Sequence, residues 1–163
     1  NIKQLPSLLS FSSINIDSYI EFIDKLEFHG TTSVFCEVEK NPYSWIYMPS
    51  RNHDSHRIIC TGNFAESNNA EGQMTATIEF TDSMSKEDIL SNLSRIPYSP
   101  KYLTHHYEMY TYPIQSTTTR EMIDDLKRRI EPKGLYLLGR FAEWEYYNMD
   151  VAMGAAIDLN KRF

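Results

Sequence analysis

The apolar residues of this chain follow helical spacing in four segments. The first is residues 16–26, where apolar side chains recur every three or four positions. Asn15 or Asp17 can cap the start of this helix, and Gly30 can end it. The other three segments are residues 85–95 after an N-cap at Ser85, a stretch from Thr118 or Thr119 to residue 130, and residues 151–159.

Alternation of apolar and polar residues predicts the sheet. It is clearest over residues 74–80, where every second side chain is apolar. A polar stretch at residues 66–72 precedes this strand and predicts a hairpin loop. Strands are expected at residues 32–38, 44–48, 56–61, 74–80, 102–112 and 135–138. Consecutive strands with separate helices predict an α+β fold, with a largely antiparallel sheet flanked by helices.

Composition and charge exclude several classes of protein. Lys and Arg total 16 against 22 Asp and Glu, a net charge of -6, whereas a nucleic-acid-binding surface needs a basic surplus. No apolar run reaches the ~18 residues of a membrane span, and no segment has the pattern of a signal peptide. Cys36 and Cys60 lie in strand-like apolar runs, which favours reduced core residues and a cytoplasmic protein.

The glycines are spaced too widely to bind a nucleotide in either of the two common ways. A dinucleotide-binding fold needs G-x-G at the start of a helix, and a P-loop needs G-x-x-x-x-G-K-[ST]. Neither motif is present, so we expect no Rossmann half in this chain. The chain also begins at Asn1 rather than at a methionine, which favours a piece of a longer protein.

Arg57 is a candidate anion anchor at the start of an apolar strand, because a guanidinium can bind phosphate through two parallel hydrogen bonds. An ordinary surface arginine fits the same pattern. Tyr110 and Tyr112 share a strand face and can present two hydroxyls to one ligand, although tyrosine also commonly fills strand faces. His53 and His56 lack a third ligand at suitable spacing, so no metal site is expected. No nucleophile motif occurs, and no residue is assigned as catalytic.

The most specific segment is L-L-G-R-F-A-E-W-E-Y-Y-N-M-D at residues 137–150. An apolar strand ends at Gly139 and Arg140, a polar and aromatic loop follows, and Asn148 precedes a helix of small residues. An arginine followed by a helix N-terminus suits an anion or an electron-rich ring edge. The alternative is an ordinary capped core helix, which does not explain so polar a loop between apolar segments.

Residues 139–150 resemble the C-terminal flavin-contacting motif of the UDP-galactopyranose mutases, G-R-(L/F/Y)-(A/G)-E-(Y/W)-x-Y-Y-D-M. That family belongs to the clan of FAD-dependent amine oxidases and protoporphyrinogen-oxidase-like enzymes. Three weaker similarities occur in the same order as in the mutases, and the resemblance covers most of the chain. They are H-R-I-I at residues 56–59, I-E-F at residues 78–80 and Y-T-Y-P at residues 110–113. Asn148 departs from the Asp common in bacterial mutases.

The resemblance implies two sets of binding residues. The set that would contact the diphosphate and ring of FAD is Gly139, Arg140, Asn148, Met149 and Asp150. The set that would hold the diphosphate of a nucleotide-sugar substrate such as UDP-galactose is Arg57, Tyr112 and Tyr146. In the mutases, the reduced flavin reacts at the anomeric carbon of the sugar, UDP leaves, and the sugar ring opens and recloses in contracted form. The protein mainly positions cofactor and substrate for this chemistry.

The resemblance also implies how the chain is organised. Residues 1–133 would form a substrate-binding domain, and residues 134–163 a strand and helix that complete a flavin site in a longer protein. We expect activity only together with the missing N-terminal FAD-binding half. Two alternatives stay open, namely another FAD-dependent oxidoreductase of the clan and a non-catalytic binding domain on the same fold. A diphosphate clamp favours a sugar nucleotide over an apolar amine or porphyrin.

Overall fold

The structure is a computed structural model that describes residues 1–10, 12–49, 51–70 and 72–163. These residues form two compact units. We call residues 29–111 the sheet unit, and residues 1–28 with 112–163 the helical unit. The predicted division after residue 133 falls inside the helical unit and stays a prediction about a longer protein. Among the described residues, no helix is both long and apolar enough to cross a membrane.

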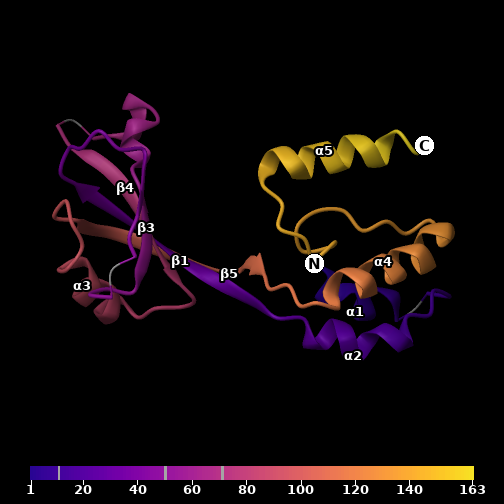
Figure 1. Cartoon of the computed structure of the whole chain (residues 1–163). Coiled ribbons are helices and arrows are strands. Elements are labelled where there is room, and N and C mark those ends of the chain that lie inside the picture. Colours follow the sequence, from indigo (N-terminus) through magenta and orange to yellow (C-terminus); the bar gives the residue numbers. More distant parts are fainter. Residues whose placement is uncertain (11, 50, 71) are drawn as a thin grey trace. The chain divides into compact units, whose positions relative to one another are not determined.

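The sheet unit is built on five strands in the order β2-β3-β4-β1-β5 (Figure 1). Their bounds are β1 (Phe28–Val38), β2 (Trp45–Tyr47), β3 (Ser55–Ile59), β4 (Met74–Thr81) and β5 (Lys101–Pro113). The pairs β1 with β4, β2 with β3, and β3 with β4 are antiparallel. The structure therefore confirms the predicted α+β fold with its antiparallel sheet.

One face of the sheet packs on α3 (Lys86–Leu93). Val34, Ile58 and Ile78 lie at paired positions on β1, β3 and β4, and they share a buried core with Ile89 of α3. Because successive residues of a strand point to opposite faces, this arrangement fixes which residues lie on the other face. Apolar burial thus orients the whole sheet.

The helical unit contains the remaining α-helices and a second core. These helices are α1 (Leu5–Leu9), α2 (Asp17–Lys25), α4 (Thr119–Ile130) and α5 (Met149–Asn160). Of these helices, α1, α2 and α4 contribute buried residues to the core. Its largest fully buried side chains are Ile2, Ile23, Ile123, Leu126, Ile130 and Trp144. The predicted helices at residues 16–26, after Thr118 or Thr119, and at residues 151–159 are therefore confirmed, with ends that differ by a few residues.

Short 3-10 helices connect several of these elements. They are η1 (Ile2–Gln4), η2 (Thr61–Asn63), η3 (Glu66–Asn68) and η4 (Glu131–Lys133). The loop predicted at residues 66–72 contains η3, and residue 71 of that loop lies outside the described residues.

Two predicted helix ends have different outcomes. Ser85 is the N-cap of α3 as predicted, because its Oγ accepts a hydrogen bond of 3.1 Å from the backbone N–H of Asp88. The prediction that Gly30 ends the first helix is wrong. Helix α2 stops at Lys25, and Gly30 lies within β1, where a close approach of β5 favours a residue without a side chain.

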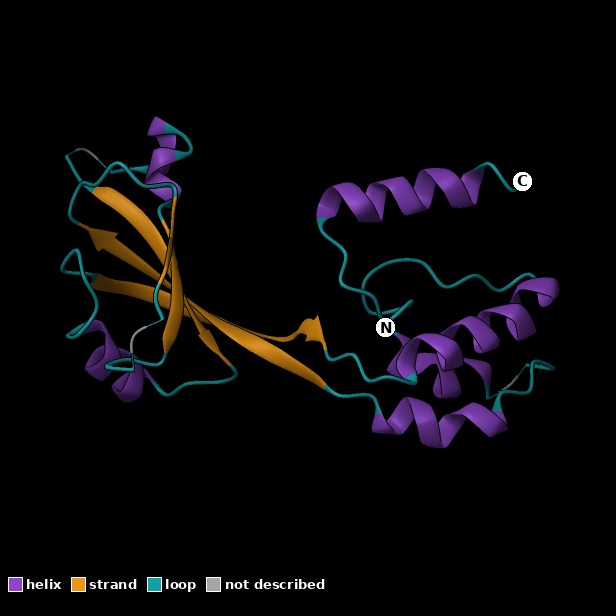
Figure 2. Cartoon of the chain, viewed as in Figure 1, coloured by secondary structure: helices purple, strands orange, loops and turns teal. Residues whose placement is uncertain are grey.

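The predicted strand at residues 135–138 is also wrong, and with it the strand in the predicted segment 134–163. Figure 2 shows this stretch as a loop between the last helices. Leu137 is buried in the core of the helical unit, and the N–H of Leu135 bonds to Ile130 O at the end of α4. A strand needs a neighbouring strand, and the described strands form one sheet that does not include this segment.

Gly30 provides a test of the strand packing. A Cβ atom at Gly30 would lie 2.5 Å from the ring of Tyr107 and 2.6 Å from the backbone oxygen of Glu108. Because the backbone of β5 must then move, we expect Gly30→Ala to lower the free energy of unfolding by about 1–3 kcal/mol. Gly154→Ala in α5 is the control, since its Cβ would meet nothing within 4 Å and Ala favours helix by roughly 1 kcal/mol. Urea denaturation measures the free energy of unfolding of both variants. Equal effects would contradict the close packing of β5 against Gly30.

Candidate functional site

A tight turn at Gly139 opens the segment that the sequence singles out. Gly139 has a φ of 95°, in the left-handed region that favours glycine. Its carbonyl oxygen accepts hydrogen bonds from the N–H groups of Ala142 and Glu143 at 3.0 and 2.9 Å. After this turn, the carboxylates of Glu143 and Glu145 pair with cations of α4.

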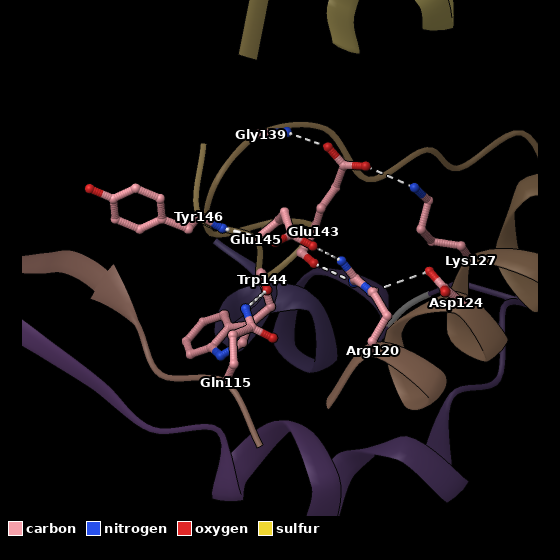
Figure 3. A network of polar contacts seen from close by, with 9 residues as sticks. All are labelled: Gln115, Arg120, Asp124, Lys127, Gly139, Glu143, Trp144, Glu145 and Tyr146. Atoms are coloured by element: carbon pink, nitrogen blue, oxygen red, sulfur yellow. Dashed lines mark hydrogen bonds and ion pairs between the residues drawn. The ribbon is translucent and has the colours of Figure 1, made fainter. Parts of the chain in front are cut away.

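The buried carboxylate of Glu143 joins this turn to α4 (Figure 3). It accepts a hydrogen bond of 3.1 Å from the N–H of Gly139 and pairs with Lys127 Nζ at 2.8 Å. Arg120 donates to the carbonyl oxygen of Glu143 at 2.8 Å and pairs with the carboxylate of Glu145. Arg120 and Lys127 are seven positions apart and so lie on one face of α4.

Trp144 anchors the same loop to the segment that follows β5. Its side chain is fully buried, and its indole Nε1 donates to Ile114 O at 3.1 Å. Gln115 donates in turn to the carbonyl oxygen of Trp144. The rings of Phe141 and Phe28 pack edge-on against the indole, with centroids 5.3 and 6.4 Å away. The loop is therefore held by the core as well as by ion pairs.

Three of the predicted binding residues meet beside this loop. The rings of Tyr112 and Tyr146 stack with centroids 5.6 Å apart and an interplanar angle of 11°. The guanidinium carbon of Arg140 lies 4.9 Å from the Tyr146 ring and 5.5 Å from the Tyr112 ring. Arg140 also donates from Nε to Tyr147 O at 2.8 Å, and from Nη2 to the same oxygen. We call Arg140, Tyr112 and Tyr146 the arginine–tyrosine cluster.

The phenol of Tyr147 lies close to the carboxylate of Glu143. Burial, followed by the charge of Glu143, raises the pKa of Tyr147 above its usual range. Tyr147 therefore stays protonated at neutral pH and can donate a hydrogen bond. The positive charge of the cluster comes from Arg140.

The other predicted cofactor residues lie at the start of α5. Asn148 occupies the N-cap position with extended backbone, as predicted, but its side chain makes no capping hydrogen bond. Met149 is 85% exposed, and Asp150 is an exposed acidic residue in the first turn. An acidic residue is favourable there because it faces the positive end of the helix dipole. The first turn of α5 is thus open to solvent in this chain.

Arg57 belongs to the sheet unit, whereas Tyr112 and Tyr146 belong to the helical unit. The guanidinium of Arg57 pairs with the carboxylate of Glu79, which lies directly opposite on β4, and stacks over Trp45 at 4.8 Å. Burial opposes the charge on Glu79, but hydrogen bonds from His56 and Arg57 outweigh it and lower the pKa of Glu79. Arg57 is therefore a partly buried, held side chain and not a mobile surface residue.

The two cysteines are buried and free, as predicted. Burial raises the pKa of the Cys36 thiol to about 12 and also raises that of Cys60, so both stay protonated. Within the described ranges, no three His, Cys, Asp or Glu side chains come together as a metal site would require.

Sequence reasoning missed the ion pairs that hold the loop. The relevant signal was the spacing of Arg120 and Lys127 on one helix face, with two glutamates in the following loop. That spacing is common on solvated helices, so it does not by itself identify a buried network.

Comparison with known proteins identifies the fold. No family model and no curated protein sequence matches the chain. Among solved structures, reduced UDP-galactopyranose mutase matches with a TM-score of 0.70 at 17% identity, over 83% of this chain and 33% of that one. A protein assigned as protoporphyrinogen oxidase from Exiguobacterium sp. 255-15 matches with a TM-score of 0.59 at 13% identity, over 84% of this chain and 34% of that one.

The class that these matches define is a fold shared by mutase- and protoporphyrinogen-oxidase-like proteins. The chain spans about a third of the length of the structures it matches. Identity this low establishes the fold alone, because one fold can support several functions.

Glu79 gives a prediction of pH dependence. Its pKa in the folded state lies below the ordinary value of 4.5, so its contribution to stability is fully present above that value and is lost as the pH falls through the folded-state pKa. We expect Glu79→Gln to cost about 1–3 kcal/mol near neutral pH, because it leaves Arg57 with a weaker partner. In urea titrations at a pH below 4.5, the difference in the free energy of unfolding between wild type and Glu79→Gln should become smaller. Glu66→Gln is the control, because Glu66 is exposed. If the difference between wild type and Glu79→Gln did not change with pH, the lowered pKa of Glu79 would be contradicted.

Proposed function

We propose that the chain is the substrate-binding and C-terminal portion of an FAD-dependent, mutase-like enzyme that acts on a sugar nucleotide such as UDP-galactose. The arginine–tyrosine cluster carries this proposal. It brings together the G-R segment, the Y-P segment at the end of β5 and the Y-Y segment before α5. The resemblance implies that Arg140 of the G-R segment contacts the cofactor, and that Tyr112 and Tyr146 of the other two segments contact the substrate. A cation beside two phenols suits the diphosphate groups that both ligands contain.

The residues of the helical unit fit one wall of a flavin site. A Cβ atom at Gly139 would meet nothing within 4 Å, so the backbone there is accessible to a ligand. The first turn of α5 is exposed, and its N–H groups suit the flavin edge. Gly139 and Arg140 would hold the diphosphate, with Asn148, Met149 and Asp150 beside the ring. The bound flavin would supply the reacting centre.

A longer protein would cover surfaces that are open in this chain. Helix α5 carries exposed apolar side chains along its length, at Met149, Val151, Met153 and Ile157. Exposed apolar patches of this kind mark interaction sites. The apolar segment at residues 135–138 has no strand beside it among the described residues. These two features support the missing N-terminal FAD-binding half as the partner of this surface.

The substrate-binding residues would act on the leaving group. In a ring contraction of UDP-galactose, the bond between sugar and UDP breaks, and negative charge grows on the diphosphate. Tyr112 and Tyr146 of the helical unit would stabilise that charge through hydrogen bonds, and Arg57 of the sheet unit has the chemistry to stabilise it through an ion pair. The pairing of Arg57 with Glu79 and its stacking on Trp45 fix the guanidinium before substrate arrives, which lowers the cost of ordering it.

The second candidate is another FAD-dependent oxidoreductase of the clan, and the match to the Exiguobacterium protein favours it. A non-catalytic binding domain on the same fold is the third candidate. An enzyme that oxidises an apolar amine or porphyrin has no use for a diphosphate clamp, so binding of UDP separates the first candidate from the second.

The full-length product of the gene tests the proposal. We expect it to purify with an oxidised-flavin absorption band and, after reduction, to interconvert UDP-galactopyranose and UDP-galactofuranose. The 163-residue chain alone should purify colourless, because it has no glycine-rich loop for the FAD pyrophosphate. A full-length protein without flavin, or one that oxidises amines or porphyrins and does not bind UDP, would refute the mutase-like assignment.

Arg140 and Tyr146 can be separated by their substitutions in the full-length protein. Arg140→Lys keeps the charge but loses the planar fork, so we expect weaker FAD retention by about 1–3 kcal/mol. The melting temperature of the apoprotein should fall as well, because Arg140 also holds Tyr147 O. Tyr146→Phe keeps the stacked ring and removes only the hydroxyl. It should weaken UDP binding and leave FAD affinity and the melting temperature unchanged.

The measurements are FAD and UDP dissociation constants by titration calorimetry, and melting of the apoprotein. If Arg140→Lys lowers the melting temperature but leaves FAD affinity unchanged, the residue is only a brace for the loop.

A further inference from the structure

The sheet face opposite α3 carries aromatic residues next to Arg57. In the register of β2 and β3, Tyr47 pairs with Arg57, whereas Ile46 pairs with the core residue Ile58. Because side chains alternate across a strand, Trp45 and Tyr47 share the face of Arg57 and point away from the core. The edge of this face is thus lined by two rings and one cation.

These side chains form a connected surface that solvent reaches. Trp45 is 41% exposed and Tyr47 is 72% exposed, and their ring centroids lie 6.2 Å apart. The guanidinium carbon of Arg57 lies 4.8 Å from the Trp45 ring. We call Trp45, Tyr47 and Arg57 the aromatic platform.

A β-bulge and a buried carboxylate hold the charged end of the platform. The register of β3 against β4 shifts between Ser55 and Arg57, so His56 and Arg57 both lie opposite Glu79. His56 Nε2 is 3.5 Å from the Glu79 carboxylate, and Arg57 pairs with the same oxygen. The position of the guanidinium is therefore determined by the sheet.

We propose that the aromatic platform binds a ring that carries a phosphate, with the ring against Trp45 and Tyr47 and the phosphate at Arg57. Aromatic side chains stack on nucleobases and pack against the apolar faces of rings. A guanidinium has several N–H donors, so it can pair with Glu79 and a phosphate together.

Aromatic residues are also common on strands for packing reasons alone. That reason applies less to Tyr47, because most of its surface is in solvent on a strand of only three residues. The proposal deepens the proposed function and rests on it for the ligand, since a sugar nucleotide offers two such rings, the base and the sugar. Their shared chemistry is a ring linked to phosphate.

Two probes distinguish the sources of the ring. UDP presents the base with its phosphates, and galactose 1-phosphate presents the sugar with a phosphate. Trp45 is the exposed tryptophan and Trp144 is fully buried, so a change in tryptophan emission on titration reports the platform. Titration calorimetry on the same chain gives the dissociation constants.

We expect Trp45→Ala and Tyr47→Ala each to raise the dissociation constant of one probe by at least about fivefold, as loss of one stacked ring predicts. Weakening of UDP binding assigns the base to the platform, and weakening of galactose 1-phosphate binding assigns the sugar. Arg57→Ala should weaken both. Leu90→Ala is the control, because it removes an exposed apolar side chain from α3, on the covered side of the sheet.

Circular dichroism checks that each variant is folded. Trp45→Phe keeps a ring, so its affinity for the probe should fall less than that of Trp45→Ala. Unchanged dissociation constants in both alanine variants, or no binding of either probe by wild type, would overturn the proposal. A full-length protein without flavin or mutase activity would refute the proposed function but leave these binding results intact. An active mutase whose dissociation constants for both probes are unchanged by substitution of Trp45 and Tyr47 would refute only the proposed role of the aromatic platform.

Discussion

The buried carboxylate of Glu143 is the contact on which the candidate site depends. Residues 135–148 contain neither a helix nor a strand of the sheet, so no backbone ladder fixes their position. Glu143 supplies that restraint, because it binds the N–H of Gly139 and the ammonium of Lys127. Burial of this carboxylate without its partners would cost free energy, so the loop favours the one position on α4 in which Glu143 is paired. The position of Arg140 beside Tyr112 and Tyr146 follows from this placement of the loop.

In the sheet unit, a buried carboxylate likewise holds a cation, here Arg57. Glu79 is buried within the sheet and holds both His56 and Arg57, which a bulge brings to the same partner. In each unit, then, a carboxylate with little exposure fixes cations that would otherwise sample many rotamers. A held guanidinium loses less entropy when an anion binds. This is the physical link between the folding of the chain and the anion-binding roles that we propose.

Much of the architecture could be predicted from local patterns. Burial of one face imposes a period of two on strands and near four on helices, so the five strands of the sheet and helices α2 to α5 were expected close to their observed bounds. Ser85 was predictable because capping is a local hydrogen bond. Residues 135–138 show where such patterns fail. Burial against helices produces the same apolar run as burial in a sheet, and only a neighbouring strand makes the difference.

The sequence by itself determined the order and chemistry of the motif at residues 139–150, together with the faces that α2, α3, α4 and the central strands of the sheet bury. Only the tertiary structure decided that Arg140 lies against Tyr112 and Tyr146, and that Arg57 rests on Trp45 and pairs with Glu79. Most of these pairs join residues on different elements, far apart in the chain. Their geometry depends on strand register, a bulge and a buried ion pair, and no local pattern encodes those three features.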